Sequence, residues 1–252
     1  MRIVILGAGN AGTVLGRLAR QAGHEILQVV SRTAAHAERL AAELGCAGIA
    51  DLNELDKTAQ LVLVTVSDEA LYHLGDQLHL GDKLIVHSAG SVSREVLSKI
   101  SCNNGVVYPL QTLRAEKKDY GRNIPLLLDG NSEYALTQLT GFANSISDRV
   151  SRGDDEQRLK LHLAGVVVSN FTNHLYCMAA EYCTKENLDF GMLQPLIEET
   201  ACRIRDYNPC AMQTGPAFRR DIVTLDKHLR VLNDHPKLRT TYLRLTDSIM
   251  NP

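Results

Sequence analysis

The sequence predicts an α/β fold in which a mostly parallel sheet, covered by helices on both faces, is followed by an all-α region. Up to residue 152, short apolar runs alternate with stretches of helical period. The apolar runs are nearly continuous, as is typical of strands buried on both faces of a parallel sheet. From residue 154 onward only helical stretches remain. We therefore expect a sheet domain at 1–152 and a helical domain at 153–252.

The expected strands and helices of the first half follow in chain order. A helix at Asn10–Ala22 separates the first two strands, and a second helix at Ala34–Leu44 is stopped by Gly45, since glycine commonly ends helices. The expected strands are Arg2–Leu6, Ile26–Ser31, Gly48–Ala50, Leu61–Val66, Lys83–His87, Val106–Val107, Pro125–Leu128 and Asp148–Ser151.

Four helices are expected in the second half. Proline is favoured in the first turn of a helix, which places helix starts at Pro216 and Pro236. Pro195 begins or kinks another helix, because proline cannot continue the backbone hydrogen-bond ladder. The expected helices are Glu156–Glu181, Phe190–Arg205, Pro216–Leu232 and Pro236–Met250.

Composition narrows the possible partners. The chain has 27 basic and 29 acidic residues and neither half has a basic excess, which argues against nucleic acid and anionic membranes. Tryptophan is absent, and no apolar stretch approaches the length of a membrane span. The six cysteines form no CxxC pair, which argues against structural zinc. We expect a cytoplasmic protein with reduced, mostly buried cysteines and no bound metal.

The clearest motif is a G-x-G-x-x-G string that follows the first strand and opens the first helix. Gly7 permits the tight turn, Gly9 has no Cβ to block a pyrophosphate, and Gly12 lets the helix lie against the strand. The free N–H groups at the helix start would then face the phosphates. A purely structural glycine-rich turn is the alternative. The expected dinucleotide-binding residues of this turn are Gly7, Ala8, Gly9, Asn10, Ala11 and Gly12.

The end of the second strand indicates which dinucleotide binds. Proteins that bind NAD place an acidic residue there to hold the ribose 2′-hydroxyl. This chain has Ser31, Arg32 and Thr33 instead. An arginine can form a bidentate pair with the 2′-phosphate of NADP, which a carboxylate would repel. The sequence therefore favours NADP, with Arg32 as a merely solvated loop arginine as the alternative.

Two more loops follow strands and are expected at the sheet edge where open α/β folds bind ligands. The first contains Val66, Ser67 and Asp68, and the second contains Ser88, Ala89 and Gly90 after His87. Small residues there would let the backbone approach a nicotinamide ring. Helix capping by Ser67 or Asp68 is compatible with that role.

A polar stripe runs along the first long helix of the second half. At 100° per residue, Ser169 and Asn173 each lie about 20° from His162, and Asn170 lies about 80° away. Such a stripe must be buried against groups that satisfy it: a cofactor cleft, a hydrogen-bonded core or a dimer seam. With an unperturbed pKa of about 6.5, His162 can donate a proton near neutral pH. His162 and Asn170 are the candidate catalytic residues.

Several stretches together carry a family resemblance: ILGAGNAG at the first turn, HSAGS, YPLQTL at 108–113, LHLAGVVVSNFTNHL at 161–175, and TGPAFRRD followed by His228-Leu229. On these stretches the chain resembles a bacterial family with a Rossmann-type, doubly wound N-terminal domain and a helical C-terminal domain of unknown function. Members of that family are generally described as NADP oxidoreductases. The resemblance spans nearly the whole chain.

The layout is more distantly similar to pyrroline-5-carboxylate reductase, ketopantoate reductase and the β-hydroxyacid dehydrogenases. These relatives imply a substrate pocket between the two domains and homodimers packed through the helical domain. Ketopantoate reductase and the β-hydroxyacid dehydrogenases use a catalytic lysine followed four residues later by an asparagine on the first long helix. If Asn170 is that asparagine, the lysine position holds Val166, so the relatives' catalytic lysine is absent.

Three functional hypotheses follow. The first is an NADP-dependent oxidoreductase that reduces a small carbonyl or imine substrate at the interdomain cleft, where the hydride chemistry belongs to the cofactor. The second is a non-catalytic NADP-binding sensor or scaffold, which the missing lysine favours. The third is a reductase that passes electrons from NADPH to flavin or ferric iron, which the low aromatic content does not support.

Overall fold

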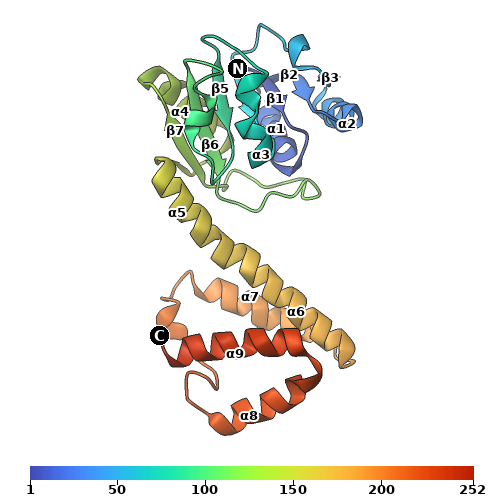
Figure 1. Ribbon diagram of the computed structural model, residues 1–252, viewed down its shortest axis with the longest axis vertical. Helices are drawn as coiled ribbons and strands as arrows, with labels where there is room; N and C mark the ends of the chain where they lie inside the picture. The colour runs from blue at the N-terminus through green and yellow to red at the C-terminus, as the bar shows by residue number, and fades with distance from the viewer. The chain divides into compact units, whose positions relative to one another are not determined.

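The computed structural model describes all 252 residues, which form two compact units, Met1–Ser169 and Asn170–Pro252. The first unit contains every strand and the second is helical (Figure 1). The sheet ends at Arg152, yet the first unit continues through the following helix. The assignment of residues 153–252 to a separate substrate and dimerisation domain stays a prediction. No helix combines the length and the hydropathy of a membrane span.

The sheet of the first unit has eight strands in the order β3-β2-β1-β4-β5-β6-β7-β8. The six strands from β3 to β6 pair in parallel, β7 runs antiparallel to β6, and β8 is parallel to β7. This confirms the predicted Rossmann-type, mostly parallel sheet, whose chain order reverses between β1 and β4. The strands are β1 (Arg2–Leu6), β2 (Glu25–Val30), β3 (Ala47–Ile49), β4 (Leu61–Val64), β5 (Leu84–His87), β6 (Asn104–Pro109), β7 (Leu126–Gly130) and β8 (Val150–Arg152).

Helices cover both faces of this sheet. Ile3 and Ile5 of β1 belong to one apolar cluster, together with α1, α2 and α4, whereas Val4 and Leu6 belong to another on the opposite face, together with α3. Since side chains alternate along a strand, a strand covered on both faces must be apolar throughout. The helices are α1 (Asn10–Gln21), α2 (Ala34–Leu44), α3 (Asp68–Tyr72), α4 (Glu133–Ile146) and α5 (Asp155–Gly165), with short 3₁₀ turns η1 (Leu52–Glu54), η2 (Leu74–Asp76) and η3 (Arg94–Leu97).

Local capping residues fix where several helices begin and end. Gly45 ends α2 in the left-handed conformation, with φ of 68°. Ser132 caps α4 by accepting a hydrogen bond from the Ala135 N–H. At the start of α5, Asp154 and Gln157 form a reciprocal capping box.

The helical unit confirms the predicted all-α region but corrects two of its helices. The expected helix Glu156–Glu181 is interrupted by a π-helical turn, η4 (Val166–Phe171), before α6 (Thr172–Lys185). The other elements are α7 (Gln194–Arg203), α8 (Ile222–Val231) and α9 (Pro236–Met250), with 3₁₀ turns η5 (Phe190–Leu193), η6 (Cys210–Met212) and η7 (Leu232–Asp234).

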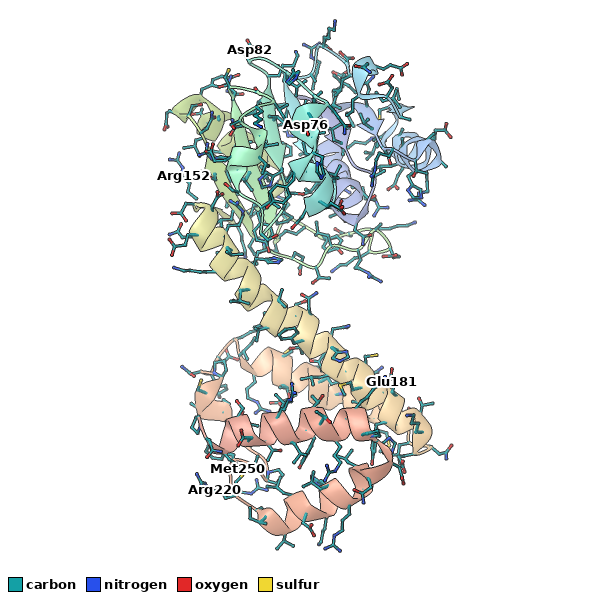
Figure 2. The ribbon with its side chains drawn as sticks, in the orientation of Figure 1. Asp76, Asp82, Arg152, Glu181, Arg220 and Met250 are labelled. Atoms are coloured by element: carbon teal, nitrogen blue, oxygen red, sulfur yellow. The ribbon has the colours of Figure 1, made fainter.

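The helix expected from Pro216 begins six residues later, at Ile222. Arg220 has a φ of 54°, which a right-handed helix cannot contain. Asp221 then caps α8 by accepting from the Thr224 N–H. Arg220 also donates to the Met250 carbonyl at the end of α9, and both residues are labelled in Figure 2. The turn between Pro216 and Ile222 is therefore a defined connection.

The expectation of mostly buried cysteines is wrong. All six are free, but only Cys183 is buried and Cys46 is half-buried. The other four cysteines lie on exposed helix faces or loops, where the apolar character of the residue type does not decide its position. The exposed ones are Cys102, Cys177, Cys202 and Cys210.

Candidate functional site

The glycine turn follows β1 directly and can hold only glycine at two of its positions. Gly7 has a φ of +108°, a conformation that side chains rarely adopt. A Cβ on Gly12 would lie 2.1 Å from the Gly7 carbonyl oxygen and 2.7 Å from Thr65 Oγ1. A Cβ on Gly9 would meet nothing within 4 Å. Gly12 thus brings α1 against the turn, while Gly9 borders open space.

The open space beside Gly9 lies at the start of α1, whose first N–H groups have no side-chain cap. Asn10 Oδ1, at the first position of the helix, accepts from the Ala115 N–H at 3.0 Å. Uncapped N–H groups and the helix dipole together favour an anion. The residues present therefore fit the pyrophosphate of a dinucleotide; that Gly7 to Gly12 bind it stays a prediction.

The end of β2 provides a second uncapped helix start. The Thr33 side chain makes no capping bond to α2, and Ser31 Oγ accepts from the Thr33 N–H at 3.4 Å. Arg32 is exposed and makes no ion pair, so its guanidinium is free to meet a ligand. A free arginine beside unsatisfied helix N–H groups suits a phosphate group.

The loops after β4 and β5 lie side by side at the carboxyl edge of the sheet. The Ser88 N–H donates to the Val64 carbonyl at 3.1 Å, and Ser91 Oγ donates to the Asp68 carboxylate. Ser67 caps α3 by accepting from the Ala70 N–H, which is the capping role considered for it. Val66 and Ala89 are half-buried and pack against one core cluster. Whether these loops also contact a nicotinamide stays a prediction.

His87, at the end of β5, is fully buried and does not face an open site. Its Nδ1 accepts from the Ala89 N–H at 3.2 Å, and its Nε2 has no hydrogen-bond partner. Burial, reinforced by the positive charge of Arg158, lowers the pKa of His87 from 6.5 to about 4. His87 is therefore a neutral structural residue beneath the β5 loop, with the imidazole proton on Nε2.

Arg158 of α5 is the largest fully buried side chain in the protein and ties the β5 loop to that helix. Its Nη2 donates to the Val92 carbonyl and to Asp155 Oδ1, the latter at 2.6 Å. Asp155 also accepts from the Ser93 hydroxyl and the Arg94 N–H. These bonds lower the pKa of the Asp155 carboxyl despite its partial burial. Sequence reasoning missed Arg158, although its position one helical turn before His162 was a usable signal.

His162 lies against the same loop and is hydrogen-bonded to Tyr108 at the end of β6. The Tyr108 hydroxyl oxygen is 3.1 Å from His162 Nδ1, and the rings meet edge to face. A Cβ on Gly90 would lie 2.6 Å from Nδ1, so the loop backbone touches the histidine ring. Two helical turns after His162, the Ser169 side chain lies against Thr112, with 2.8 Å between Ser169 Oγ and Thr112 Oγ1. Hydrogen bonds thus satisfy the stripe within the first unit.

Two members of the predicted stripe, Asn170 and Asn173, belong to the helical unit and are exposed there. A catalytic role for Asn170 stays a prediction. Tyr108 was not among the expected site residues, although it opens the YPLQTL stretch that carried part of the resemblance. Its importance shows only in the fold, which brings it to a residue 54 positions away.

Two family descriptions match the chain. Residues 2–90 match the family described as NADP oxidoreductase, coenzyme F420-dependent. Residues 124–249 match the domain of unknown function DUF2520. The first range includes the glycine turn and both strand-end loops, and the second includes His162. No curated protein matches the chain.

Solved structures support the same placement. A Bacteroides fragilis protein, provisionally described as an NADP oxidoreductase, is 37% identical; the match covers 100% of this chain and 98% of that one, with a TM-score of 0.92. A 1-pyrroline-5-carboxylate reductase from Streptococcus pyogenes is 14% identical; the match covers 100% of this chain and 99% of that one, with a TM-score of 0.65. A reductive aminase from Aspergillus terreus, solved in complex with NADPH and ethyl-5-oxohexanoate, is 16% identical; the match covers 98% of this chain and 94% of that one, with a TM-score of 0.69. The last two show the fold alone.

The strand order, the glycine turn and the comparisons place the chain in a class of proteins described as NADP oxidoreductases, which have a Rossmann-type domain and a helical C-terminal region. Within this class the chain belongs to the DUF2520 family, and it is 37% identical over its whole length to the Bacteroides fragilis protein. The expected family resemblance is thereby confirmed.

Proposed function

We propose that the protein is an NADP-dependent reductase of a small carbonyl or imine substrate. The observation that carries the proposal is the position of His162, hydrogen-bonded to Tyr108 and in contact with the Gly90 loop. This loop and the glycine turn lie at the same edge of the sheet, where open α/β folds bind their ligands. The reductive aminase and the pyrroline-5-carboxylate reductase named above support C=N among the candidate substrate bonds.

The residues of the first unit would bind and orient the dinucleotide. NADPH supplies the hydride. The open face of Gly9 and the α1 N-terminus would receive the pyrophosphate, and Arg32 with the α2 N-terminus would receive the 2′-phosphate. Backbone at Ser88 to Gly90 would support the nicotinamide ring. His162 would face the heteroatom of the substrate and stabilise, through a hydrogen bond, the negative charge that hydride transfer develops there; the proton that completes the reduction would come from water.

The substitution Arg32→Asp tests the cofactor assignment. We expect NADPH to bind about 100-fold more weakly while NADH binding changes little, because an anion receptor is replaced by an anion. Calorimetric titration of both cofactors at the same salt concentration measures the two effects.

The matched control is Arg152→Asp, which makes the same charge change at exposed β8, on the opposite side of the sheet from β2 (Figure 2). It should leave both affinities near those of the unaltered protein. Equal losses of NADPH and NADH binding in Arg32→Asp would remove Arg32 from the 2′-phosphate site.

A non-catalytic NADP sensor is the second candidate, and the valine at position 166 favours it because the catalytic lysine of more distant relatives is missing there. Measuring the oxidation of NADPH distinguishes the two functions. A reductase oxidises NADPH in the presence of cyclic imines or small ketones, whereas a sensor binds NADPH without consuming it.

We also propose that the protein forms a homodimer through its helical region. Two apolar side chains one helical turn apart on α5 face solvent on the same side of the helix: Leu159 is 51% exposed and Leu163 63%. A contiguous exposed apolar strip on a helix is typical of an interface, and a second copy of the chain is the simplest partner.

The substitution Leu163→Glu should weaken such a dimer about tenfold or more, because it buries an unpaired carboxylate in the interface. Sedimentation velocity across a micromolar dilution series measures this. Tyr134→Glu, at an exposed apolar residue of α4, is the control and should leave association unchanged. A monomeric unaltered protein throughout the series would exclude the dimer.

A further inference from the structure

The contact between Tyr108 and His162 determines where the imidazole carries its proton. Burial raises the pKa of the Tyr108 phenol, so the hydroxyl stays protonated near neutral pH, although the nearby charge of Arg158 opposes this effect. His162 Nδ1 is the one hydrogen-bond partner of that hydroxyl. A buried hydroxyl proton needs an acceptor, and Nδ1 is the atom within reach. When the phenol donates to Nδ1, the imidazole proton must reside on Nε2.

The Gly90 loop closes the Nδ1 side of the same ring. A Cβ at Gly90 would lie 2.6 Å from Nδ1 and 2.9 Å from Tyr108 Cε2, so the loop backbone occupies the space around both groups. This leaves no room for another ligand at Nδ1. His162 Nε2 makes no hydrogen bond within the protein and is not among the buried unsatisfied atoms. The free polar atom of the ring is therefore Nε2.

We propose that Tyr108 is a positioning residue that fixes His162 as the Nε2–H tautomer and so presents an N–H donor to the substrate heteroatom. This inference rests on the proposed function and deepens it by defining the substrate class. A neutral N–H donor needs a lone pair on its partner, which a carbonyl oxygen or a neutral imine nitrogen offers. An iminium nitrogen has no such lone pair. The site is thus suited to carbonyls and uncharged imines and unsuited to iminium ions.

The protein contains a matched control for this pair. In the helical unit, the Tyr242 hydroxyl lies 2.8 Å from His228 Nδ1, and the two rings also meet edge to face. The two pairs share the same atoms and similar geometry, but the second has no glycine-rich strand-end loop against it. Phenylalanine at position 108 or 242 removes one hydroxyl and keeps the ring.

The test is nitrogen NMR of the ¹⁵N-labelled full chain above the pKa of free histidine, with His162 assigned through His162→Gln. In the unaltered protein we expect a protonated Nε2 and a hydrogen-bonded, unprotonated Nδ1 for His162. Tyr108→Phe should shift the Nδ1 resonance and raise the fraction of the Nδ1–H tautomer, while Tyr242→Phe moves only the His228 signals. A proton on Nδ1 in the unaltered protein, or an unmoved Nδ1 resonance in Tyr108→Phe, overturns the proposal.

A kinetic measurement separates this proposal from the proposed function. With a ketone or imine that is turned over, Tyr108→Phe should lower kcat at least about tenfold and leave the KM for NADPH unchanged; an unchanged kcat overturns the role of Tyr108. If calorimetry shows no NADPH binding, the proposed reductase function is wrong. The NMR measurement still decides whether the Tyr108 hydroxyl keeps the His162 proton on Nε2.

Discussion

The substitution Gly12→Ala is expected to destabilise the sheet-bearing unit by about 3 kcal/mol or more. Its Cβ would lie 2.1 Å from the Gly7 carbonyl oxygen, and that oxygen accepts a hydrogen bond from Thr65 Oγ1 at 3.0 Å. Because the obstructing atom is backbone and is held in place, the side chain cannot be accommodated by a rotamer change. Alanine would gain about 1 kcal/mol of helix propensity over glycine, which is too little to offset the clash. The urea midpoint of unfolding measures the loss.

Gly9→Ala is the matched variant, since it adds the same methyl group to the same turn, three residues before Gly12. Gly9 has a φ of −85° and its Cβ would meet nothing within 4 Å, so the urea midpoint should not fall. The methyl group would instead enter the space proposed for the pyrophosphate, and NADPH binding should weaken at least about tenfold. Full NADPH affinity in Gly9→Ala would show that the phosphates lie elsewhere. An unchanged midpoint in Gly12→Ala would show that the turn can open.

Local patterns in the sequence were sufficient to predict the sheet. Ile3 and Val4 lie on opposite faces of β1 and both are buried, so a continuous apolar run correctly indicated a central strand. The antiparallel direction of β7 was not predictable in the same way. Its apolar run looks like that of a parallel strand, and its direction depends on the long connection from β6.

The predictable part of the candidate site is likewise the local part. The glycine turn could be interpreted from a few adjacent residues, because its chemistry depends on backbone that those residues supply. Tyr108 and Arg158 were missed because their partners lie 54 and 66 positions away in the chain. A single sequence contains no periodicity that pairs such distant residues. His162 could be singled out as polar on an apolar helix, but its hydrogen-bond partner required the fold.

Acidification should destabilise the protein through His87 before the carboxylates titrate. In the unfolded chain this histidine has a pKa near 6.5, whereas in the fold burial and the Arg158 charge hold its pKa at about 4. Between these values the unfolded chain binds a proton that the folded chain does not, so stability falls as pH falls. The stabilisation is fully present above the unfolded pKa, and about 3 kcal/mol is lost by the folded pKa.

Comparison with His87→Asn isolates this contribution, because the asparagine oxygen can still accept from the Ala89 N–H while the side chain no longer titrates. Urea midpoints measured from neutral pH to about pH 4 should fall more steeply for the unaltered protein than for the variant. His24, whose pKa is also lowered by burial, contributes equally to both curves. Parallel curves would mean that the folded protein protonates His87 freely, which requires the Ala89 N–H to move away so that Nδ1 can take up the second proton.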